Sequence, residues 1–179
     1  MLTRPGRFEL NYLSRRRDKP THVVVADGSL NSWLEGGVTS LDMILEYAPN
    51  QGFLNVAAIG EFSLQEAERT FLEMLDAVAR YKVEKVLFDG RRLTGDPKTM
   101  ERFYYGEFAA DSVFKFRDRG VSPATKFAYV LKEPVLDPRR FGETVAVNRG
   151  MHVKAFVNLE DAFGWLGIVP PNKPHAGDG

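Results

Sequence analysis

Apolar residues recur at helical spacing between residues 63 and 79, and this segment is the clearest element in the chain. The polar side chains of the same segment fall on the opposite side, which is the pattern of a helix with one buried face. Ser63 is followed three residues later by Glu66, a capping box that marks a helix start. The positions that predict the buried face are Leu64, Ala67, Phe71, Leu75, Val78 and Ala79.

Short apolar segments bounded by turn residues predict five strands. Residues 41–47 alternate apolar and polar side chains, the pattern of a strand with one buried face. Asn50-Gln51-Gly52 then supplies a turn before residues 53–59, so these two strands are expected to form a hairpin. The other three strands are expected at residues 83–88, 126–131 and 151–157.

Capping signals predict three further helices between and after these strands. Asp96-Pro97 and Asp137-Pro138 each place a capping aspartate before a proline at the first helical position. Gly150 stands where a helix C-cap is expected. Asn158 is expected to cap a short final helix that runs through Trp165.

These elements follow the order β-β-α-β-α-β-α-β-α, which predicts an α/β fold. Strands separated by helices need crossover connections, so we expect a mixed, mostly parallel sheet of about five strands with helices packed on it. One domain is expected over residues 41–168. Residues 1–40 are a basic extension that is either weakly ordered or adds one strand at 22–26, and residues 169–179 have the composition of a disordered tail.

Charge and composition exclude several classes of function. The 179 residues include 24 basic and 24 acidic side chains, so no overall field attracts nucleic acid or an anionic membrane. The first 20 residues carry six basic and two acidic side chains, but a basic arm without a recognition element gives weak support for nucleic-acid binding. Nucleic acid is therefore not an expected partner.

The absence of cysteine excludes disulfides and thiolate metal sites. No apolar run approaches the roughly 20 residues that a transmembrane helix needs, so no membrane span is expected. The N-terminal arginines are not followed by the apolar segment of a secretory signal. A cytoplasmic location is the expectation that follows.

Three stretches carry a resemblance to a known family: residues 86–95 (VLFDGRRLTG), 101–108 (ERFYYGEF) and 137–150 (DPRRFGETVAVNRG). Together with the element order, they resemble the SpoIIAA-like family, a bacterial branch of the STAS fold related to CRAL-TRIO lipid-binding folds. The resemblance covers about residues 41–166. It implies a STAS-type domain that works as a non-enzymatic regulatory or protein-interaction module.

The chain departs from one motif of that group. Anti-anti-sigma members carry an Asp-Ser-Ser-Gly-type signature whose serine is phosphorylated, whereas residues 89–96 contain no serine here. Thr94 is the one hydroxyl in this segment and is the candidate phosphosite. The alternative is a turn threonine that bonds to nearby backbone.

Two arginine pairs are expected at the carboxyl ends of strands, where open α/β sheets bind their ligands. Arg91-Arg92 and Arg139-Arg140 also lie close to expected helix N-termini, whose free amides favour anions. One hypothesis is that the four arginines bind an anion or an acidic partner. The alternative is a solvated rim on which they pair with the nearby carboxylates of Asp89, Asp96, Asp137 and Glu143.

The expected helix after Asp96 is strongly aromatic. Its side chains are either simple core or the wall of a pocket for an apolar, lipid-like ligand, as the CRAL-TRIO relationship implies. Tyr104 and Tyr105 are adjacent and cannot face the same way, so one of them is expected at the surface, where it would mark a partner interface. The candidate pocket residues are Met100, Phe103, Tyr104, Phe108 and Phe116.

No catalytic residue, metal site or cofactor is predicted. His22, His152 and His175 match no metal-ligand spacing, and the chain contains no nucleophile-elbow, phosphate-loop or dinucleotide motif. The leading hypothesis is therefore a regulatory or protein-interaction module. The alternative is a carrier or sensor of a small apolar ligand, and a homo-oligomer stays open.

Overall fold

The computed structural model describes residues 22–25, 42–48 and 52–170. Within them, one sheet contains six strands whose order in the sheet equals their order in the sequence. β2 and β3 are antiparallel, and every other neighbouring pair is parallel. The strands are β1 (His22–Val25), β2 (Asp42–Ala48), β3 (Phe53–Glu61), β4 (Lys85–Thr94), β5 (Lys126–Val130) and β6 (His152–Phe156).

The predicted α/β class, the mixed and mostly parallel sheet and the opening hairpin are confirmed. The sheet has six strands in place of about five because β1 adds to its edge, parallel to β2 with His22 opposite Ile44. The other residues of the predicted 1–40 extension lie outside the described residues, as do residues 171–179. The domain limits of 41–168 and the tail at 169–179 therefore stay predictions.

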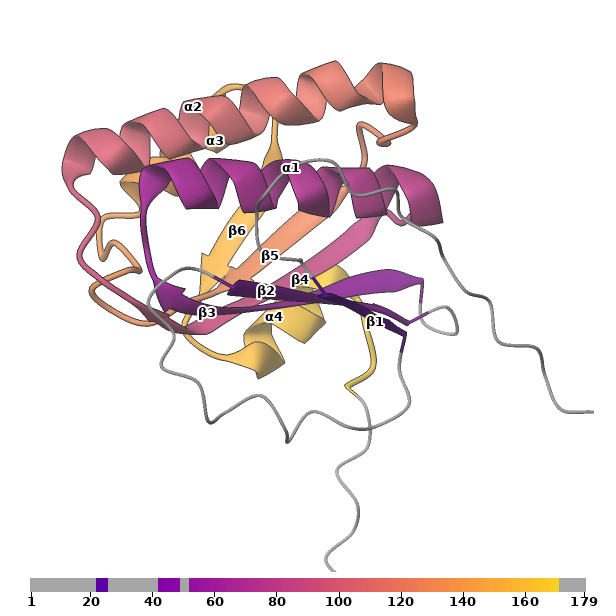
Figure 1. The fold of residues 1–179 in the computed structure, drawn as a ribbon, viewed down its shortest axis with the longest axis horizontal. Helices are drawn as coiled ribbons and strands as arrows, with labels where there is room; N and C mark the ends of the chain where they lie inside the picture. The colour runs from indigo at the N-terminus through magenta and orange to yellow at the C-terminus, as the bar shows by residue number, and fades with distance from the viewer. Residues whose placement is uncertain (1–21, 26–41, 49–51, 171–179) are drawn as a thin grey trace, which may run out of the picture.

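Three helices cover one face of the sheet and a fourth covers the other (Figure 1). Each of the first three connects two neighbouring parallel strands, and right-handed crossovers place such helices on the same face. The last helix follows the final strand and folds under the opposite face. The helices are α1 (Leu64–Tyr81), α2 (Thr99–Lys115), α3 (Phe141–Asn148) and α4 (Leu159–Leu166), and a short 3₁₀ helix, η1 (Phe116–Arg119), follows α2. Among the described helices, none is long and apolar enough to cross a bilayer.

Side chains along the central strands alternate between the two faces of the sheet and form a separate core on each face. In β5, Phe127 and Tyr129 pack beneath α1, α2 and α3, whereas Ala128 and Val130 pack against α4. Both faces are covered, so β5 is apolar at nearly every position, as expected for a buried parallel strand.

Capping explains where two of the helices begin. Ser63 accepts a hydrogen bond from the Glu66 amide, and Asn158 accepts one from the Asp161 amide, so both predicted N-caps are confirmed. The predicted start at Asp96-Pro97 is wrong, because α2 begins at Thr99 after Lys98. There the Glu101 carboxylate accepts a hydrogen bond from the Lys98 amide, while the Asp96 carboxylate pairs with cations instead.

The β4 strand is longer than its apolar pattern predicts. The sequence predicts that this strand ends at residue 88, yet residues 89–94 continue the pairing with β3 as far as Thr94 opposite Glu61. A register shift between Ala57 and Ile59 accommodates an extra residue on the β4 side. Such a bulge bends a strand without ending it, and it cannot be read from hydrophobic alternation.

α2 and α3 pack against each other through two glycines. A Cβ atom at Gly106 would lie 2.5 Å from the carbonyl oxygen of Gly142, and a Cβ atom at Gly142 would lie 3.1 Å from that of Arg102. Side chains at these positions would hold the helices apart. The glycines therefore fix α2 and α3 as one closely packed pair.

We expect Gly106→Ala to lower the free energy of unfolding by about 1–3 kcal/mol, because the new methyl group must push α3 away. Urea denaturation followed by circular dichroism measures this change. Gly164→Ala in α4 is the matched control, since a Cβ atom added there would have no described atom within 4 Å. The control should be neutral or stabilising by up to about 1 kcal/mol, and equal losses in the two variants would contradict the close packing.

Candidate functional site

A cavity of about 140 Å³ lies beneath α2 and α3, toward the carboxyl ends of the central strands. Its wall is mainly apolar and draws on elements from α1 to β6. Lining residues from the strands and their ends include Phe88, Leu93, Tyr129, Leu131, Val153 and Ala155, and those from the two helices include Tyr105, Gly106, Ala109 and Ala146.

The cavity is larger than the voids of a packed protein core, because natural cores contain few voids bigger than a water molecule. It is partly open to solvent, so water can reach its apolar wall. An apolar molecule of matching shape would remove part of that wall from water, which is favourable by roughly 25 cal/mol per Å² of apolar surface.

Tyr105 and Tyr129 contribute uncharged polar groups to the cavity wall. The hydroxyl oxygens of Tyr105 and Tyr129 lie 3.2 Å apart, within hydrogen-bonding distance. Burial raises the pKa of Tyr105 to about 12 and raises the pKa of Tyr129 well above its ordinary value. Both side chains therefore stay uncharged at neutral pH and present neutral hydrogen-bonding groups.

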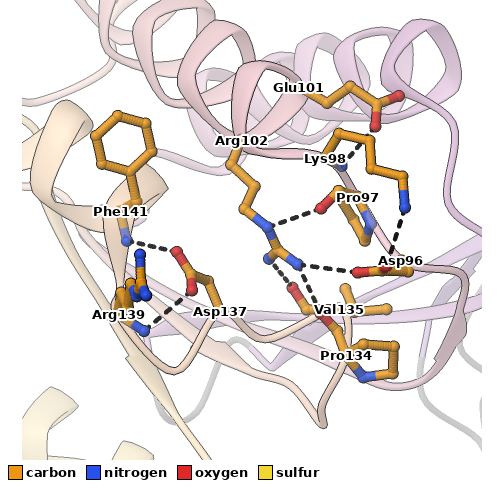
Figure 2. Close-up of polar contacts among 10 residues, drawn as sticks. All are labelled: Asp96, Pro97, Lys98, Glu101, Arg102, Pro134, Val135, Asp137, Arg139 and Phe141. Carbon is orange, nitrogen blue, oxygen red and sulfur yellow. Dashed lines mark hydrogen bonds and ion pairs between the residues drawn. The ribbon is translucent and has the colours of Figure 1, made fainter.

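Arg102 ties together the two loops at the mouth of the cavity, as Figure 2 shows. Its Nε atom donates to the Pro97 carbonyl, and its two terminal nitrogens donate to the carbonyls of Val135 and Pro134. The second of these nitrogens also lies 3.7 Å from Asp96. A planar guanidinium carries several donors in a fixed arrangement, which suits it to join three carbonyls at once.

Asp137 organises the start of α3 on the other side of the mouth (Figure 2). Its two carboxylate oxygens accept hydrogen bonds from the amides of Arg139 and Phe141, each at 3.0 Å. Burial alone would raise the pKa of Asp137. The two amide hydrogen bonds and the charges of Arg102 and Arg139 outweigh that effect, so the pKa lies below its ordinary value.

Glu143 and Arg140 complete the charged lining. A carboxylate oxygen of Glu143 accepts a hydrogen bond from the Ala155 amide on the edge strand β6. Arg140 Nη1 lies 3.8 Å from the same oxygen, and among the described residues it has no hydrogen-bond partner. Two cations and two carboxylates thus line the mouth, and their charges balance.

The four arginines predicted as an anion or partner site have different surroundings. Arg91 forms two hydrogen bonds with the Asp89 carboxylate, at 2.8 and 2.7 Å, which is the pairing that the alternative interpretation predicts. Arg92 and Arg139 are exposed. Of the four, Arg140 alone lines the cavity. Binding of an anion or acidic partner by these arginines stays a prediction.

Thr94 ends β4, and its hydroxyl donates to the Gly60 carbonyl at 3.2 Å. This is the backbone-bonded threonine of the alternative interpretation. The residue is exposed at the sheet surface. Its phosphorylation stays a prediction.

An apolar cavity lies beneath α2, the helix for which the sequence predicts a pocket for an apolar ligand. Ligand binding by the five predicted residues stays a prediction. None of the five predicted residues lines this cavity. Met100 and Tyr104 are 54% and 48% exposed, Phe103 is half-buried beside them, and Phe108 and Phe116 pack into the core around Phe71 and Ala109. The hydrophobic pattern of α2 is nearly equal on all sides, so it does not indicate which face turns inward.

Sequence reasoning missed Arg102 and the tyrosine pair. The sequence pattern places Tyr105 beside Tyr104 on a helix and Tyr129 in a strand, and it does not indicate that the two tyrosines meet. The alternation of β5 places Tyr129 on the same face as Phe127, which identifies it as buried. The hydroxyl of a buried tyrosine usually has a hydrogen-bond partner. Together with the strand pattern, this rule indicates a polar contact at Tyr129.

No family model matches the chain, and no curated protein matches it. Solved structures similar to it include an anti-sigma factor antagonist from Mycobacterium paratuberculosis, with 15% identity and a TM-score of 0.46 over 72% of this chain and 95% of that one. Another is an uncharacterized DUF3478 family protein with a SpoIIAA-like fold from Shewanella loihica, with 17% identity and a TM-score of 0.42 over 74% of this chain and 98% of that one.

Replacing Arg102 by lysine should lower the free energy of unfolding by about 2 kcal/mol, because a lysine ammonium cannot reach all three carbonyls and leaves polar groups unpaired. Hydrogen exchange should also speed up in residues 132–137. Arg69→Lys in α1 is the control, because an ion pair between residues four apart on a helix, such as Arg69 with Glu73, is worth well under about 1 kcal/mol. Similar losses in both variants would show that the three carbonyl bonds contribute little.

Asp137 should make stability depend on pH in the acidic range. Its folded pKa lies below the unfolded value of about 3.9, so its stabilisation is present at neutral pH and is lost as the pH falls through the folded pKa. Asp137→Asn should therefore be less stable than the wild type at pH 7, and the difference should shrink below about pH 4. Urea denaturation at several pH values measures it, and a difference independent of pH would contradict this assignment.

Proposed function

We propose that this protein is a non-enzymatic module that binds a protein partner through an aromatic surface on α2 and α3. The surface, here named the aromatic patch, consists of Met100, Phe103, Tyr104 and Phe141. The observation that carries the proposal is that these large apolar side chains gather on the outside of the domain. The resemblance of the sequence motifs to SpoIIAA-like regulatory modules supports the same class of function.

Ring contacts make the patch one continuous surface. The Phe103 ring lies 5.7 Å from that of Tyr104 and 6.3 Å from that of Phe141, which it meets nearly parallel. Met100 precedes Phe103 and Tyr104 by three and four residues, so it lies beside them on the helix surface. Single exposed apolar residues are ordinary on protein surfaces, but a contiguous group marks an interaction site.

The rim of the patch is charged. The Arg149 guanidinium lies 5.5 Å from the centre of the Phe103 ring and pairs with Glu107 of α2. Aromatic residues, methionine and arginine are enriched at the centres of protein interfaces. This composition therefore favours a protein partner with its own apolar anchor.

The carboxylates near the cavity support binding over catalysis. Both oxygens of Asp137 accept backbone amides, and Glu143 holds the Ala155 amide. These groups are engaged in holding loops and a strand edge in place. A general base needs a carboxylate that is free to accept a proton from substrate.

Photo-crosslinking tests the patch directly. A photoreactive phenylalanine analogue at Tyr104 should capture a specific partner in cells, whereas the same analogue at Val157, which is 60% exposed beside α4, should not. The captured protein is then purified and its affinity for this chain is measured by titration. Equal capture from both positions would contradict the proposed surface.

With that partner, we expect Met100→Ser combined with Tyr104→Ser to weaken binding by about tenfold or more, since central aromatic anchors each contribute on the order of 1–2 kcal/mol. Val157→Ser is the matched exposed control and should leave the affinity unchanged. Melting temperatures should stay close to wild type, because the substituted side chains are exposed.

Two other outcomes would overturn the proposal. A second copy of this chain as the sole captured species would make the patch a self-association surface, which analytical ultracentrifugation would confirm. The second outcome is that charge reversal of the predicted arginine site lowers the affinity for the partner, while the patch variants leave it unchanged. That site comprises Arg91, Arg92, Arg139 and Arg140.

A further inference from the structure

We propose that the cavity beneath α2 binds a small, uncharged, mostly apolar molecule that carries one hydrogen-bond acceptor, such as a phenol or a short ketone. This site goes beyond the aromatic patch and lies on the opposite side of the same helix. Met100, Phe103 and Tyr104 face outward, whereas Tyr105 and Ala109 line the cavity.

The volume sets the size of the ligand. The cavity measures about 140 Å³, and apolar cavities of roughly 150 Å³ in protein cores take up benzene. Its apolar wall includes Phe88, Leu93 and Leu131, which favour a hydrocarbon body. A molecule the size of a single ring therefore fits.

The hydroxyls of Tyr105 and Tyr129 determine which polar group the ligand needs. Two hydroxyls carry two donor protons, and the single hydrogen bond between Tyr105 and Tyr129 uses one of them. For the other proton, the described residues provide no acceptor. A ligand oxygen at the wall would accept it, which an unsubstituted hydrocarbon cannot do.

The surroundings disfavour a charged ligand. Burial holds both tyrosines neutral, so neither offers a charge to an ion. Arg102 already donates to three carbonyls at the mouth. The unpartnered nitrogen of Arg140 lies 3.8 Å from the Glu143 carboxylate, so a ligand carboxylate approaching it would meet a like charge. Moving an unpaired ion into an apolar cavity is costly.

Three probes of similar shape test the proposal on the full chain: phenol, benzene and benzoate. Methyl resonances of Ala109, Leu93 and Leu131 should shift on titration with phenol, and those of Val157 should not. Benzene should bind roughly fivefold more weakly because it lacks the acceptor. Benzoate should cause no saturable shift.

Two variants separate the contributions of volume and hydrogen bonding. Ala109→Leu places new atoms in the cavity, so it should abolish phenol binding and raise the melting temperature. Asp111→Leu adds the same side chain on an exposed part of α2 and should keep wild-type binding. The double variant with Tyr105→Phe and Tyr129→Phe should keep benzene binding and lose the preference for phenol. Because it replaces both hydrogen-bond partners by rings of the same shape, this variant should stay folded.

The proposal is overturned if neither phenol nor benzene shifts the cavity methyl groups at millimolar concentration. It is also overturned if Ala109→Leu binds phenol as well as Asp111→Leu does. If Ala109→Leu fails to fold, the double tyrosine variant decides, and an unchanged phenol preference there refutes the role of the hydroxyls. The Met100→Ser and Tyr104→Ser variant should bind phenol normally, so failure at the patch and failure at the cavity are distinguishable.

Discussion

The close approach of α2 to α3 is the constraint on which both candidate sites depend. Gly106 and Gly142 let the two helices meet backbone to backbone, at a separation that a single methyl group would prevent. The pair then covers the sheet as one unit (Figure 1). Its inner side leaves the cavity above β4, β5 and β6, and its outer side carries the aromatic patch. One backbone contact thereby positions two surfaces of different chemistry.

Charged side chains hold the mouth of the cavity in place. Arg102 joins the segment after β4 to the segment after β5 through three carbonyls, and Asp137 fixes the first amides of α3. Loops usually carry less stable structure than the elements that they connect. Here the side chains of Arg102 and Asp137 bond to backbone carbonyls and amides that have no partner within their own short loop. Water would otherwise have to bond to these backbone groups. The cavity is therefore bordered by ordered backbone.

The resemblance to SpoIIAA-like modules and the physical features of the chain agree on the fold and differ on where function lies. The family resemblance points to the loop after the third predicted strand and to its hydroxyl at Thr94. In the structure this segment is part of a strand, and the Thr94 hydroxyl bonds to backbone. The unusual physical features lie elsewhere, in an apolar cavity beneath α2 and α3 and in an exposed group of aromatic rings. Those features, and not the motif, carry the functions proposed for this protein.

The sequence by itself determined the α/β class, the opening hairpin and the caps at Ser63 and Asn158, because strand periodicity and capping are local properties of the chain. It did not determine which side of α2 faces inward, because α2 carries apolar residues on all of its sides. Only the tertiary structure placed Tyr105 against Tyr129 and Met100 on the outside. It also decided the position of Arg102, whose acceptors lie more than 30 residues away in two cases. Contacts between distant segments leave no periodic signal, so the cavity and the patch could be found only in the folded chain.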